Sequence, residues 1–151
     1  MADQDTTTAD TGTSTAPAEQ SGPKTFVWGV GRRKSAVARV RIAPGTGKIT
    51  VNERELNDYF TFERDRKAIF GPLEVTNTGG KMDIHVNATG GGPSGQTGAI
   101  IMGLARALTK YDATLEAPLR GANFMTRDSR MKERKKYGRR GARRGFQFSK
   151  R

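Results

Sequence analysis

The feature that most constrains this chain is a basic segment at its C-terminus that cannot form a hydrophobic core of its own. Residues 127–151 contain twelve Lys or Arg and two acidic residues, and so carry +10 of the chain's formal net charge of +12. Five of their side chains are apolar or aromatic: Met131, Tyr137, Ala142, Phe146 and Phe148. So little apolar surface does not offset the entropy lost on ordering a self-repelling segment. We therefore predict that this basic tail (residues 127–151) is disordered until a polyanion binds it.

Nucleic acid is the polyanion that the composition of the basic tail favours. Arg outnumbers Lys in it, and the forked guanidinium group suits paired contacts with phosphate oxygens. Its three glycines let the backbone approach a phosphate chain closely, and its three aromatic rings offer faces on which bases can stack. A solvated tail, a nuclear-targeting signal and a membrane-surface anchor are the alternatives. The anchor is disfavoured because neither a lipidation motif nor an amphipathic apolar face accompanies the charge.

The composition also excludes other kinds of protein. The chain has 151 residues, the length of one domain with extensions, and it has no cysteine, which removes disulfides, thiolate zinc sites and Cys nucleophiles. It has no run of eighteen apolar residues, and its N-terminus lacks a basic region followed by an apolar one. We therefore expect no membrane span and no secretory signal, and we expect a cytoplasmic protein.

Three regions follow from the composition. Residues 1–24 are rich in Thr, Ala, Asp and Ser and contain four acidic residues, so we predict a disordered acidic extension. Residues 25–126 are predicted to form a globular α+β domain, since about a hundred residues can bury enough apolar surface to fold. Residues 127–151 are the basic tail. The sequence shows no internal repeat, and we expect no homo-oligomer.

Strands are predicted wherever apolar residues alternate with other residues. Residues 26–30 resemble a first strand interrupted by glycine, and residues 35–42 alternate cleanly, with the even-numbered side chains forming the core face. Residues 48–51 and 82–88 follow the same period, and a glycine-rich turn is predicted over residues 44–47.

Helices are predicted in the middle of the chain and after the last strand. Residues 52–70 read as two short helices, with Thr61 as the cap of the second and Gly71–Pro72 as its end. The charged residues in the middle of the second helix are expected to form a solvated face. Residues 73–75 are interpreted as an edge strand, and residues 115–125 as a last helix or turn.

Residues 97–110 form the clearest helix of the sequence, with Ser94 placed to cap it. One side of this helix carries a stripe of small residues, Ala99, Gly103 and Ala107. Such a stripe allows a close approach to a sheet or to RNA, and we favour the sheet.

A group of basic residues in the predicted domain is suited to RNA. Arg32, Arg33 and Lys34 follow a glycine directly, and Arg39 and Arg41 lie on the outer face of the next predicted strand. Because these five cations lie close together along the chain, we expect the domain to dock on RNA through them.

A glycine-rich loop over residues 90–97 is the second candidate. It resembles the phosphate-binding loop of nucleotide-binding enzymes, but Gln96 stands where that motif requires lysine, and no acidic partner for magnesium is clear. It also contains the GxxG of KH domains, whose loop lies between two helices rather than after a strand. Two readings stay open: a tight turn with no ligand, or a helix N-terminus whose backbone N–H groups hold one RNA phosphate. The residues of that phosphate contact are Gly91, Gly92, Gly95 and Gln96.

The sequence shows no constellation for catalysis or metal binding, and it implies no cofactor. His85, the only histidine, is predicted on the polar face of a strand with Asp83 and Asn87, without a second His or any Cys in the chain. We therefore expect a surface histidine rather than a catalytic or metal-binding one, and a protein that is not an enzyme.

Three separated stretches form one pattern along the chain. Residues 29–35 read GVGRRKS, residues 90–108 hold the glycine loop and the small-residue helix, and residues 126–136 and 147–151 frame the basic tail. Together they resemble the opening motif, the central signature and the tail of the S-nine family of bacterial small-subunit ribosomal proteins. The resemblance covers residues 26–151.

The resemblance implies a fold, a place and a set of partners. The fold is the ribosomal S5 domain 2-like α+β sandwich, two layers with helices on a mixed sheet, from which the basic tail extends. The place is the head of the small subunit, where the family binds the 3′ major domain of 16S rRNA beside neighbouring ribosomal proteins. The tail threads through rRNA, and its tip reaches the anticodon stem-loop of P-site tRNA. One departure is Asn123, which stands where the family usually has glycine and which tolerates a left-handed turn.

The charge pattern and the resemblance together assign RNA contacts to two groups of side chains. We expect rRNA to be bound by Arg32, Arg33, Lys34, Arg39, Arg41, Arg127, Arg130, Lys132, Arg134, Lys135, Lys136, Arg139, Arg140, Arg143 and Arg144. By resemblance, P-site tRNA is reached by Ser149, Lys150 and Arg151. A tail that follows phosphates without reading bases suits a site that accepts every tRNA. The alternative functions are a free basic nucleic-acid-binding protein outside the ribosome and, more distantly, a nucleotide-dependent enzyme built on residues 90–97.

Overall fold

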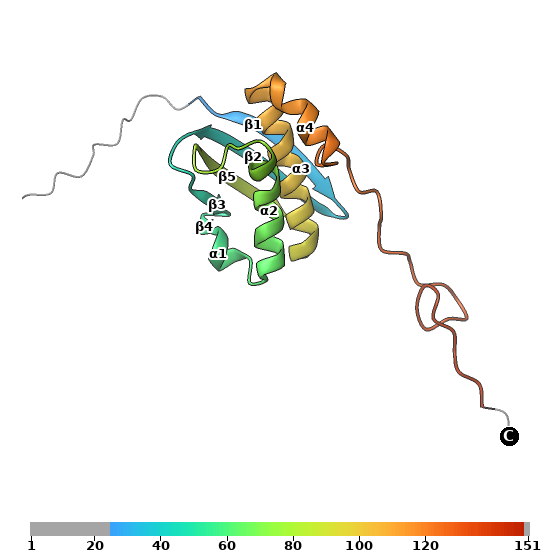
Figure 1. Ribbon diagram of the computed structural model, residues 1–151. Helices are drawn as coiled ribbons and strands as arrows, with labels where there is room; N and C mark the ends of the chain where they lie inside the picture. Colours follow the sequence, from blue (N-terminus) through green and yellow to red (C-terminus); the bar gives the residue numbers. More distant parts are fainter. Residues whose placement is uncertain (1–24, 150–151) are drawn as a thin grey trace, which may run out of the picture.

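Residues 25–149 are described by the computed structural model, in which helices cover one face of a five-stranded sheet (Figure 1). The strands lie in the order β1-β2-β5-β3-β4; β3 runs parallel to β5, and all other neighbours are antiparallel. The sheet is therefore mixed, which confirms the α+β sandwich predicted from the sequence. The strands are β1 Val27–Arg33, β2 Ala36–Pro44, β3 Ile49–Val51, β4 Arg54–Glu55 and β5 Met82–Thr89.

Among the described residues, four α-helices and one 3-10 helix complete the body. The longest, α3, lies on β1 and β2 with α2 beside it (Figure 1). No helix in residues 25–149 has both the length and the apolar character needed to cross a membrane. The helices are α1 Leu56–Tyr59, α2 Glu63–Val75, α3 Pro93–Tyr111, the 3-10 helix η1 Ala113–Leu115 and α4 Glu116–Gly121.

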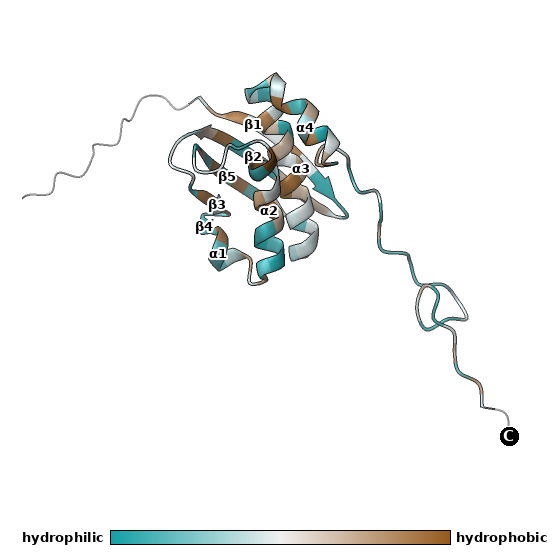
Figure 2. Ribbon diagram, viewed as in Figure 1, coloured by the Kyte–Doolittle hydropathy of each residue, from teal (hydrophilic) through white to brown (hydrophobic). Residues whose placement is uncertain are grey.

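Alternation along the strands divides the sheet into a core face and an open face. Every second residue from Ala36 to Ile42 on β2 is buried, and so is every second residue from Met82 to Ala88 on β5. The strand register aligns these two buried rows, so they form one apolar layer under the helices. In Figure 2 apolar residues are frequent in the strands and in α3, whereas the described part of the tail is mostly hydrophilic. The predicted core face of the sheet is confirmed.

The helix α2 is longer than its sequence suggests. It runs through Pro72 to Val75, so the predicted helix end and the predicted edge strand at residues 73–75 are both wrong. Proline inside a helix costs about 3 kcal/mol, because it removes a hydrogen bond and its ring crowds the preceding turn. Here Ile69, Pro72 and Leu73 are all buried, and their packing in the core outweighs the local preference.

The predicted helix caps are also wrong. Phe62 takes the cap position of α2 and makes no side-chain cap bond, so Thr61 is not the cap. α3 begins at Pro93, with Gly92 rather than Ser94 in the cap position. Proline suits the first helical position because the N–H that it lacks would have no helical partner there.

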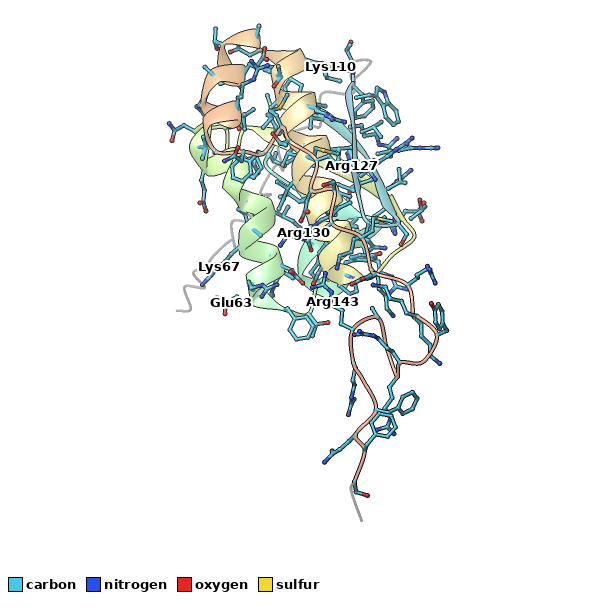
Figure 3. All side chains as sticks on the ribbon, turned by 90° about the vertical axis from the view of Figure 1, so that its right-hand side faces the viewer. Glu63, Lys67, Lys110, Arg127, Arg130 and Arg143 are labelled. Carbon is cyan, nitrogen blue, oxygen red and sulfur yellow. The ribbon has the colours of Figure 1, made fainter. Side chains whose placement is uncertain are left out.

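The charged middle of α2 is only partly solvated. Glu63 and Lys67 are exposed and form an ion pair at 2.8 Å, as a solvated face predicts (Figure 3). Asp65 is only 6% exposed, so the prediction is wrong for this residue. The Nε of Arg66 is buried and has no hydrogen-bond partner within residues 25–149. Neither burial is signalled by the sequence, in which all of these residues are charged.

The last helix is shorter than the predicted span of residues 115–125. After η1, α4 covers Glu116–Gly121, and the chain then turns at Asn123 with a φ of 60°. The Phe124 N–H donates to the carbonyl of Leu119 at 3.1 Å across this turn. The left-handed turn predicted for Asn123 is therefore confirmed.

Glycines on β1 let α3 lie directly on the strand. A Cβ at Gly29 would overlap the carbonyl oxygen of Gly103, and one at Gly31 would overlap that of Ala99. Two residues span about 6.6 Å along a strand and four residues span about 6.0 Å along a helix, so the two spacings match. The small-residue stripe of α3 therefore packs on the sheet, as the sequence predicts.

Two cationic side chains of α3 donate hydrogen bonds to backbone carbonyl groups of β1, which is an edge strand of the sheet. Arg106 Nη1 donates to the carbonyl of Val30 at 2.9 Å, and Lys110 Nζ donates to the carbonyl of Trp28 at 3.0 Å. These partners are again two residues apart on the strand and four apart on the helix. Because an uncovered edge invites pairing with another strand, the two side chains protect this edge.

Replacing Gly31 by alanine is expected to lower the free energy of unfolding by about 2 kcal/mol, because overpacking against the helix backbone forces α3 to move. Urea unfolding followed by circular dichroism measures the change. Gly121→Ala is the matched control, because a Cβ at that position in α4 meets no atom within 4 Å. Wild-type stability in Gly31→Ala would contradict the close contact of β1 and α3.

Candidate nucleic-acid interface

Three segments that are distant in the sequence meet at one end of the body. They are residues 32–35 at the end of β1, the glycine loop of residues 90–96, and residues 126–132 at the root of the basic tail. The helix α3 runs antiparallel to β1, so its N-terminal end lies beside the C-terminal end of that strand. We call this assembly of three segments the basic corner.

The glycine loop fits tightly against the turn that joins β1 and β2. Gly90 has a φ of 69° and Gly91 a φ of 65°, values that L side chains rarely adopt. A Cβ at Gly90 would lie 2.7 Å from the carbonyl oxygen of Ser35, and one at Gly91 would lie 3.0 Å from the Cβ of Ala36. Both the backbone conformation and the available space therefore require glycine in this loop.

A chain of side-chain hydrogen bonds connects the glycine loop to the body and braces it. Gln96 Nε2 donates to the carbonyl of Gly90 at 3.2 Å, and Tyr59 Oη donates to Gln96 Oε1 at 2.8 Å. Asn52 Nδ2 donates to Tyr59 Oη at 3.3 Å and to the carbonyl of Ala88 at 2.9 Å. Gln96, which stands at the lysine position of a nucleotide-binding loop, thus uses its amide to hold the loop in shape.

The four residues predicted to hold a phosphate through their backbone differ in availability. Gly91 and Gly92 are exposed. The N–H groups of Gly95 and Gln96 donate to the carbonyl of Gly92 at 2.9 and 3.0 Å. Two of the four donors are therefore engaged within the first turn of α3, and the exposed backbone of Gly91 and Gly92 carries the remaining candidates.

Arg33 joins the three segments of the basic corner. Its Nη1 donates to the carbonyl of Ser94 at 3.1 Å, and its Nη2 donates to Asp128 Oδ2 at 2.9 Å. Its side chain also lies against Gly98, where a Cβ would collide with it. Only 29% of the Arg33 side chain and 27% of the Asp128 side chain are exposed, so their ion pair is partly shielded from water. Arg33 therefore fastens the tail root to the body.

Asp128 holds a second arginine, Arg130, with most of its hydrogen bonds. Its Oδ1 accepts from the backbone N–H of Arg130 at 3.1 Å and from the Nε at 3.0 Å, and its Oδ2 accepts from the Nη2 at 2.9 Å. These bonds to Arg130, and to a lesser degree the bond to Arg33, hold the pKa of the Asp128 carboxyl well below its usual range. Asp128 therefore stays ionised, and keeps both arginines, at neutral pH.

A groove of about 420 Å³ opens beside this ion pair, between the body and the tail root. Its lining consists of Arg33, Lys34, Asp128, Arg130, Met131 and Lys132. Four of these six residues are cations, and three of the four are exposed. A groove with this charge and size can hold a phosphate group of a nucleic acid.

The structure separates the predicted RNA-binding residues of the body into two places. Arg32, Arg33 and Lys34 belong to the basic corner. Arg39 and Arg41 lie instead on the open face of the sheet, where they alternate with the buried core residues of β2. The two groups are neighbours in sequence, yet they face different surroundings.

The described part of the tail leaves the body as an irregular segment. Residues 126–149 form no helix or strand (Figure 1), and most of their side chains are exposed. Figure 3 shows Arg127 and Arg130 on the stretch beside α3, before the segment turns away from the body. Ser149 is exposed. Lys150 and Arg151, together with the predicted N-terminal extension of residues 1–24, lie outside the described residues.

Part of the tail closes into a loop around Glu133. Lys136 Nζ donates to Glu133 Oε1 at 2.7 Å, and Arg143 Nε donates to Glu133 Oε2 at 2.9 Å. Arg139 Nη1 also donates to the carbonyl of Arg143 at 2.8 Å. All of these partners are exposed, and exposed ion pairs are screened by salt and contribute little to stability.

His85 is half-buried on the open face of the sheet rather than fully exposed. Its Nδ1 lies 2.8 Å from Thr50 Oγ1, and its ring packs edge-on against Phe26 with centroids 6.0 Å apart. No group of three or more His, Cys, Asp or Glu side chains that could hold a metal occurs within residues 25–149. The neighbours of His85 therefore give it a packing role.

Three residues that hold the basic corner in place, one within it and two beside it, are not identified by the sequence. Asp128 carries a signal, because it is an isolated acid in a basic run, and such an acid has cations to hold. Asn52 and Tyr59 carry none, because their partners Ala88 and Gln96 lie 36 and 37 positions away. Only the fold shows that these two side chains brace the loop.

The fold and the distribution of charge define a class of protein. It is an α+β protein whose cations are gathered in one corner and one tail, as a polyanionic partner requires, and residues 25–149 contain no group of three or more His, Cys, Asp or Glu side chains that could hold a metal. Residues 31–151 match the family described as Ribosomal protein S9/S16. The chain therefore belongs to the S9/S16 family of ribosomal proteins, and it is a structural component rather than an enzyme.

Individual relatives agree with this family. The chain is 55% identical over 123 residues to the small ribosomal subunit protein uS9 of Rhodopirellula baltica, which covers 82% of this chain and 90% of that protein. It is also 55% identical over 122 residues to the small ribosomal subunit protein uS9 of Anaeromyxobacter sp. strain K, covering 81% of this chain and 94% of that protein. The resemblance seen in the sequence motifs is confirmed.

Asp128 is expected to titrate below an ordinary aspartate, whose pKa is about 3.9. Folding lowers the pKa of Asp128. The arginine contacts therefore stabilise the tail root fully at pH values above the ordinary pKa of aspartate, and this stabilisation is lost as the pH falls through the lowered pKa of the folded protein. Carbon-detected NMR of the carboxyl group measures the titration. Arg130→Gln should raise the pKa more than Arg33→Gln, since the Arg130 side chain donates two of the three side-chain hydrogen bonds to Asp128. The reverse order would contradict this assignment.

The brace of the glycine loop is tested by a double-mutant cycle. Tyr59→Phe and Gln96→Ala are each expected to lower the free energy of unfolding by about 1 kcal/mol, because each removes a hydrogen bond of the brace. The double variant should lose about 0.5–1 kcal/mol less than the sum, since the two side chains share one bond. Tyr59→Phe with Thr114→Ala is the additive control. Strict additivity of Tyr59→Phe and Gln96→Ala would show that their bond is absent in solution.

Proposed function

We propose that this chain is a structural rRNA-binding protein in the head of the small ribosomal subunit, where it contacts the 3′ major domain of 16S rRNA and neighbouring proteins. The tip of its basic tail, residues 149–151, reaches P-site tRNA during translation. The protein acts in the cytoplasm as part of the ribosome. The observation that carries this proposal is the match of residues 31–151 to the S9/S16 ribosomal protein family.

The distribution of charge supports rRNA as the main partner. The basic tail carries +10 in twenty-five residues, and most of the described ones are exposed. Each phosphate that a Lys or Arg neutralises releases condensed counterions, which drives binding. With six to ten such contacts, affinity is expected to fall roughly 10³- to 10⁵-fold between about 50 and 200 mM salt.

The basic corner supports the proposal that the body contacts RNA directly, beside the point where the tail begins. The partly shielded ion pair of Arg33 and Asp128 fixes the start of the tail against β1 and α3. The cationic groove next to this pair lies where the tail leaves the body. A phosphate chain that enters the groove can therefore continue along the basic tail.

The length of the tail supports contact with a second RNA. The residues from 127 to 149 can span at most about 75 Å when extended, at about 3.3 Å per residue. The described part of the tail, which ends at Ser149, runs away from the body (Figure 1). A tip that far from the body can meet a tRNA while the root remains on rRNA.

Two alternative functions are disfavoured. A free nucleic-acid-binding protein outside the ribosome does not account for the family match across residues 31–151. A nucleotide-dependent enzyme would need a lysine at position 96, where the amide of Gln96 is bonded to Tyr59 and Gly90.

Deleting residues 127–151 is expected to abolish stable incorporation into small subunits, because the deletion removes ten of the chain's twelve net positive charges. Reconstituted subunits are sedimented through a gradient at moderate salt, and the bound protein is quantified. Normal incorporation of the truncated chain would show that the tail is not the principal anchor.

Deleting only residues 149–151 is expected to leave incorporation nearly intact and to weaken P-site tRNA binding several-fold. Filter binding of tRNA to purified subunits measures the affinity. The double variant Arg64→Gln/Lys81→Gln is the matched control, since it also removes two positive charges, from exposed positions on the body. Unchanged tRNA affinity in the tail-tip deletion would refute the assignment of the tip.

A further inference from the structure

The open face of the sheet carries a group of side chains that the basic corner and the tail do not explain. On β1, Trp28 is 48% exposed and Val30 is 41% exposed. The register places Trp28 opposite Arg41 and Val30 opposite Arg39, so an apolar row on β1 adjoins a cationic row on β2. The open-face patch is defined here as Phe26, Trp28, Val30, Val37, Arg39 and Arg41.

The packing of α3 makes this patch rigid. Because Gly29 and Gly31 face the helix and leave no space for a side chain, Trp28 and Val30 are directed to the open face. Their carbonyl groups are held at the strand edge by Lys110 and Arg106 of α3. The strand is thus fixed both from behind and from its edge, and the patch is preorganised for a ligand.

Arg41 connects the aromatic rings of the patch. Its guanidinium carbon lies 5.4 Å from the ring centroid of Phe26 and 6.0 Å from that of Trp28. Phe26 in turn packs edge-on against His85. A guanidinium group that contacts rings through its face keeps N–H donors at its edge, where a phosphate oxygen can accept them.

The charge of the open face favours an anionic ligand. Arg39 and Arg41 lie on β2, and Asp83 is the one acidic residue of β5 on this face. The Oδ1 of Asp83 accepts hydrogen bonds from the backbone N–H groups of residues 46–48. Positive charge and the exposed ring of Trp28 therefore dominate the patch. Single-stranded nucleic acid supplies both phosphates for the arginines and flat bases for the rings.

We propose that the open-face patch binds unpaired bases of RNA, with a base stacked on Trp28 and phosphates contacting Arg39 and Arg41. The inference rests on the proposed function and adds an RNA contact separate from the basic corner and the tail. Stacking tolerates every base, so the patch has no marked sequence preference. Bases of a duplex are paired and stacked on each other, so the patch prefers single-stranded loops and bulges.

Photocrosslinking from position 28 tests the proposal directly. Trp28 is replaced by the photoreactive p-benzoylphenylalanine in the full chain, which is then assembled into small subunits and irradiated. Crosslinks to unpaired nucleotides of 16S rRNA are expected. Crosslinks to a ribosomal protein, or only to paired rRNA, would overturn the proposal. The same residue placed at Tyr137, which is exposed on the tail, is the control for the photochemistry. No crosslink from position 28 with a crosslink from position 137 would also overturn it.

The crosslinking experiment separates this inference from the proposed function. Failure of both photoreactive chains and of the wild-type chain to enter subunits counts against the proposed function. Entry into subunits with position 28 contacting protein counts against the open-face patch alone.

Fluorescence gives a second readout with the isolated full chain. Trp28 is the only tryptophan, so its emission reports on the patch and not on the tail. A single-stranded oligouridine is expected to quench this emission saturably, whereas an RNA duplex with the same number of phosphates quenches it little. Equal quenching by both RNAs, or none by either, would overturn the proposal.

Variants of the patch sharpen the comparison. Trp28→Ala is expected to weaken binding of the labelled oligouridine by about 5- to 150-fold, the loss of one stacked base, and to change duplex binding little. Arg41→Gln should lower the affinity for the labelled oligouridine more than Arg54→Gln does. The second variant removes an exposed arginine from β4, outside the patch. Equal losses in the two arginine variants would reduce the effect to net charge and contradict a built site.

Discussion

The close contact between β1 and α3 determines most of the structure around it. Because Gly29 and Gly31 carry no side chains, the helix backbone rests on the strand itself. Because of this contact, Trp28 and Val30 lie on the open face of the sheet, and two cationic side chains of α3 donate hydrogen bonds to their carbonyl groups. It also brings the start of α3, and the glycine loop before it, beside the turn that follows β1. The open-face patch, the covered strand edge and the basic corner therefore follow from one packing constraint. That constraint depends on the match between a two-residue step on a strand and a four-residue step on a helix.

The number of basic residues overstates the charge that is available to RNA, because several cations are engaged within the chain. Arg106 and Lys110 bond to the backbone of β1, and Arg33 is divided between Ser94 and Asp128. In the tail, three further cations contact two acids: Arg130, Lys136 and Arg143 contact Asp128 and Glu133. Within residues 25–149, the tail cations without an acidic partner are Arg127, Lys132, Arg134, Lys135, Arg139, Arg140 and Arg144. These unpaired cations can bind phosphates directly. The paired cations must first release a carboxylate, and until then their ion pairs fix the local conformation of the tail.

How much the sequence predicts depends on the range of the interactions involved. Alternation is local and repeated, so the core face of β2 and β5 and the small-residue face of α3 are predicted correctly. The end of α2 is not, because burial of Ile69, Pro72 and Leu73 against distant residues outweighs the breaking tendency of proline. The cationic residues of the site can be identified from the sequence, but the residues to which they bond cannot. Arg33 and Asp128 lie 95 positions apart, and only the tertiary fold brings them together. The sequence therefore predicts which residues carry charge, and the fold determines which of these residues are available to bind phosphates.

The two acids of the tail solve a problem that charge alone creates. A purely cationic segment repels itself and the basic corner, so its root would leave the body and its direction would be undefined. Asp128 prevents this through Arg33, in an ion pair that is partly shielded and hence less screened by salt. Glu133 acts farther out with exposed partners, which a phosphate chain can replace with bonds of the same kind. RNA can therefore unfold the outer loop at little net cost while the root stays attached. Only the residues beyond the root would then lose conformational entropy on binding, so a rooted tail is expected to bind RNA more tightly than a free peptide of the same sequence.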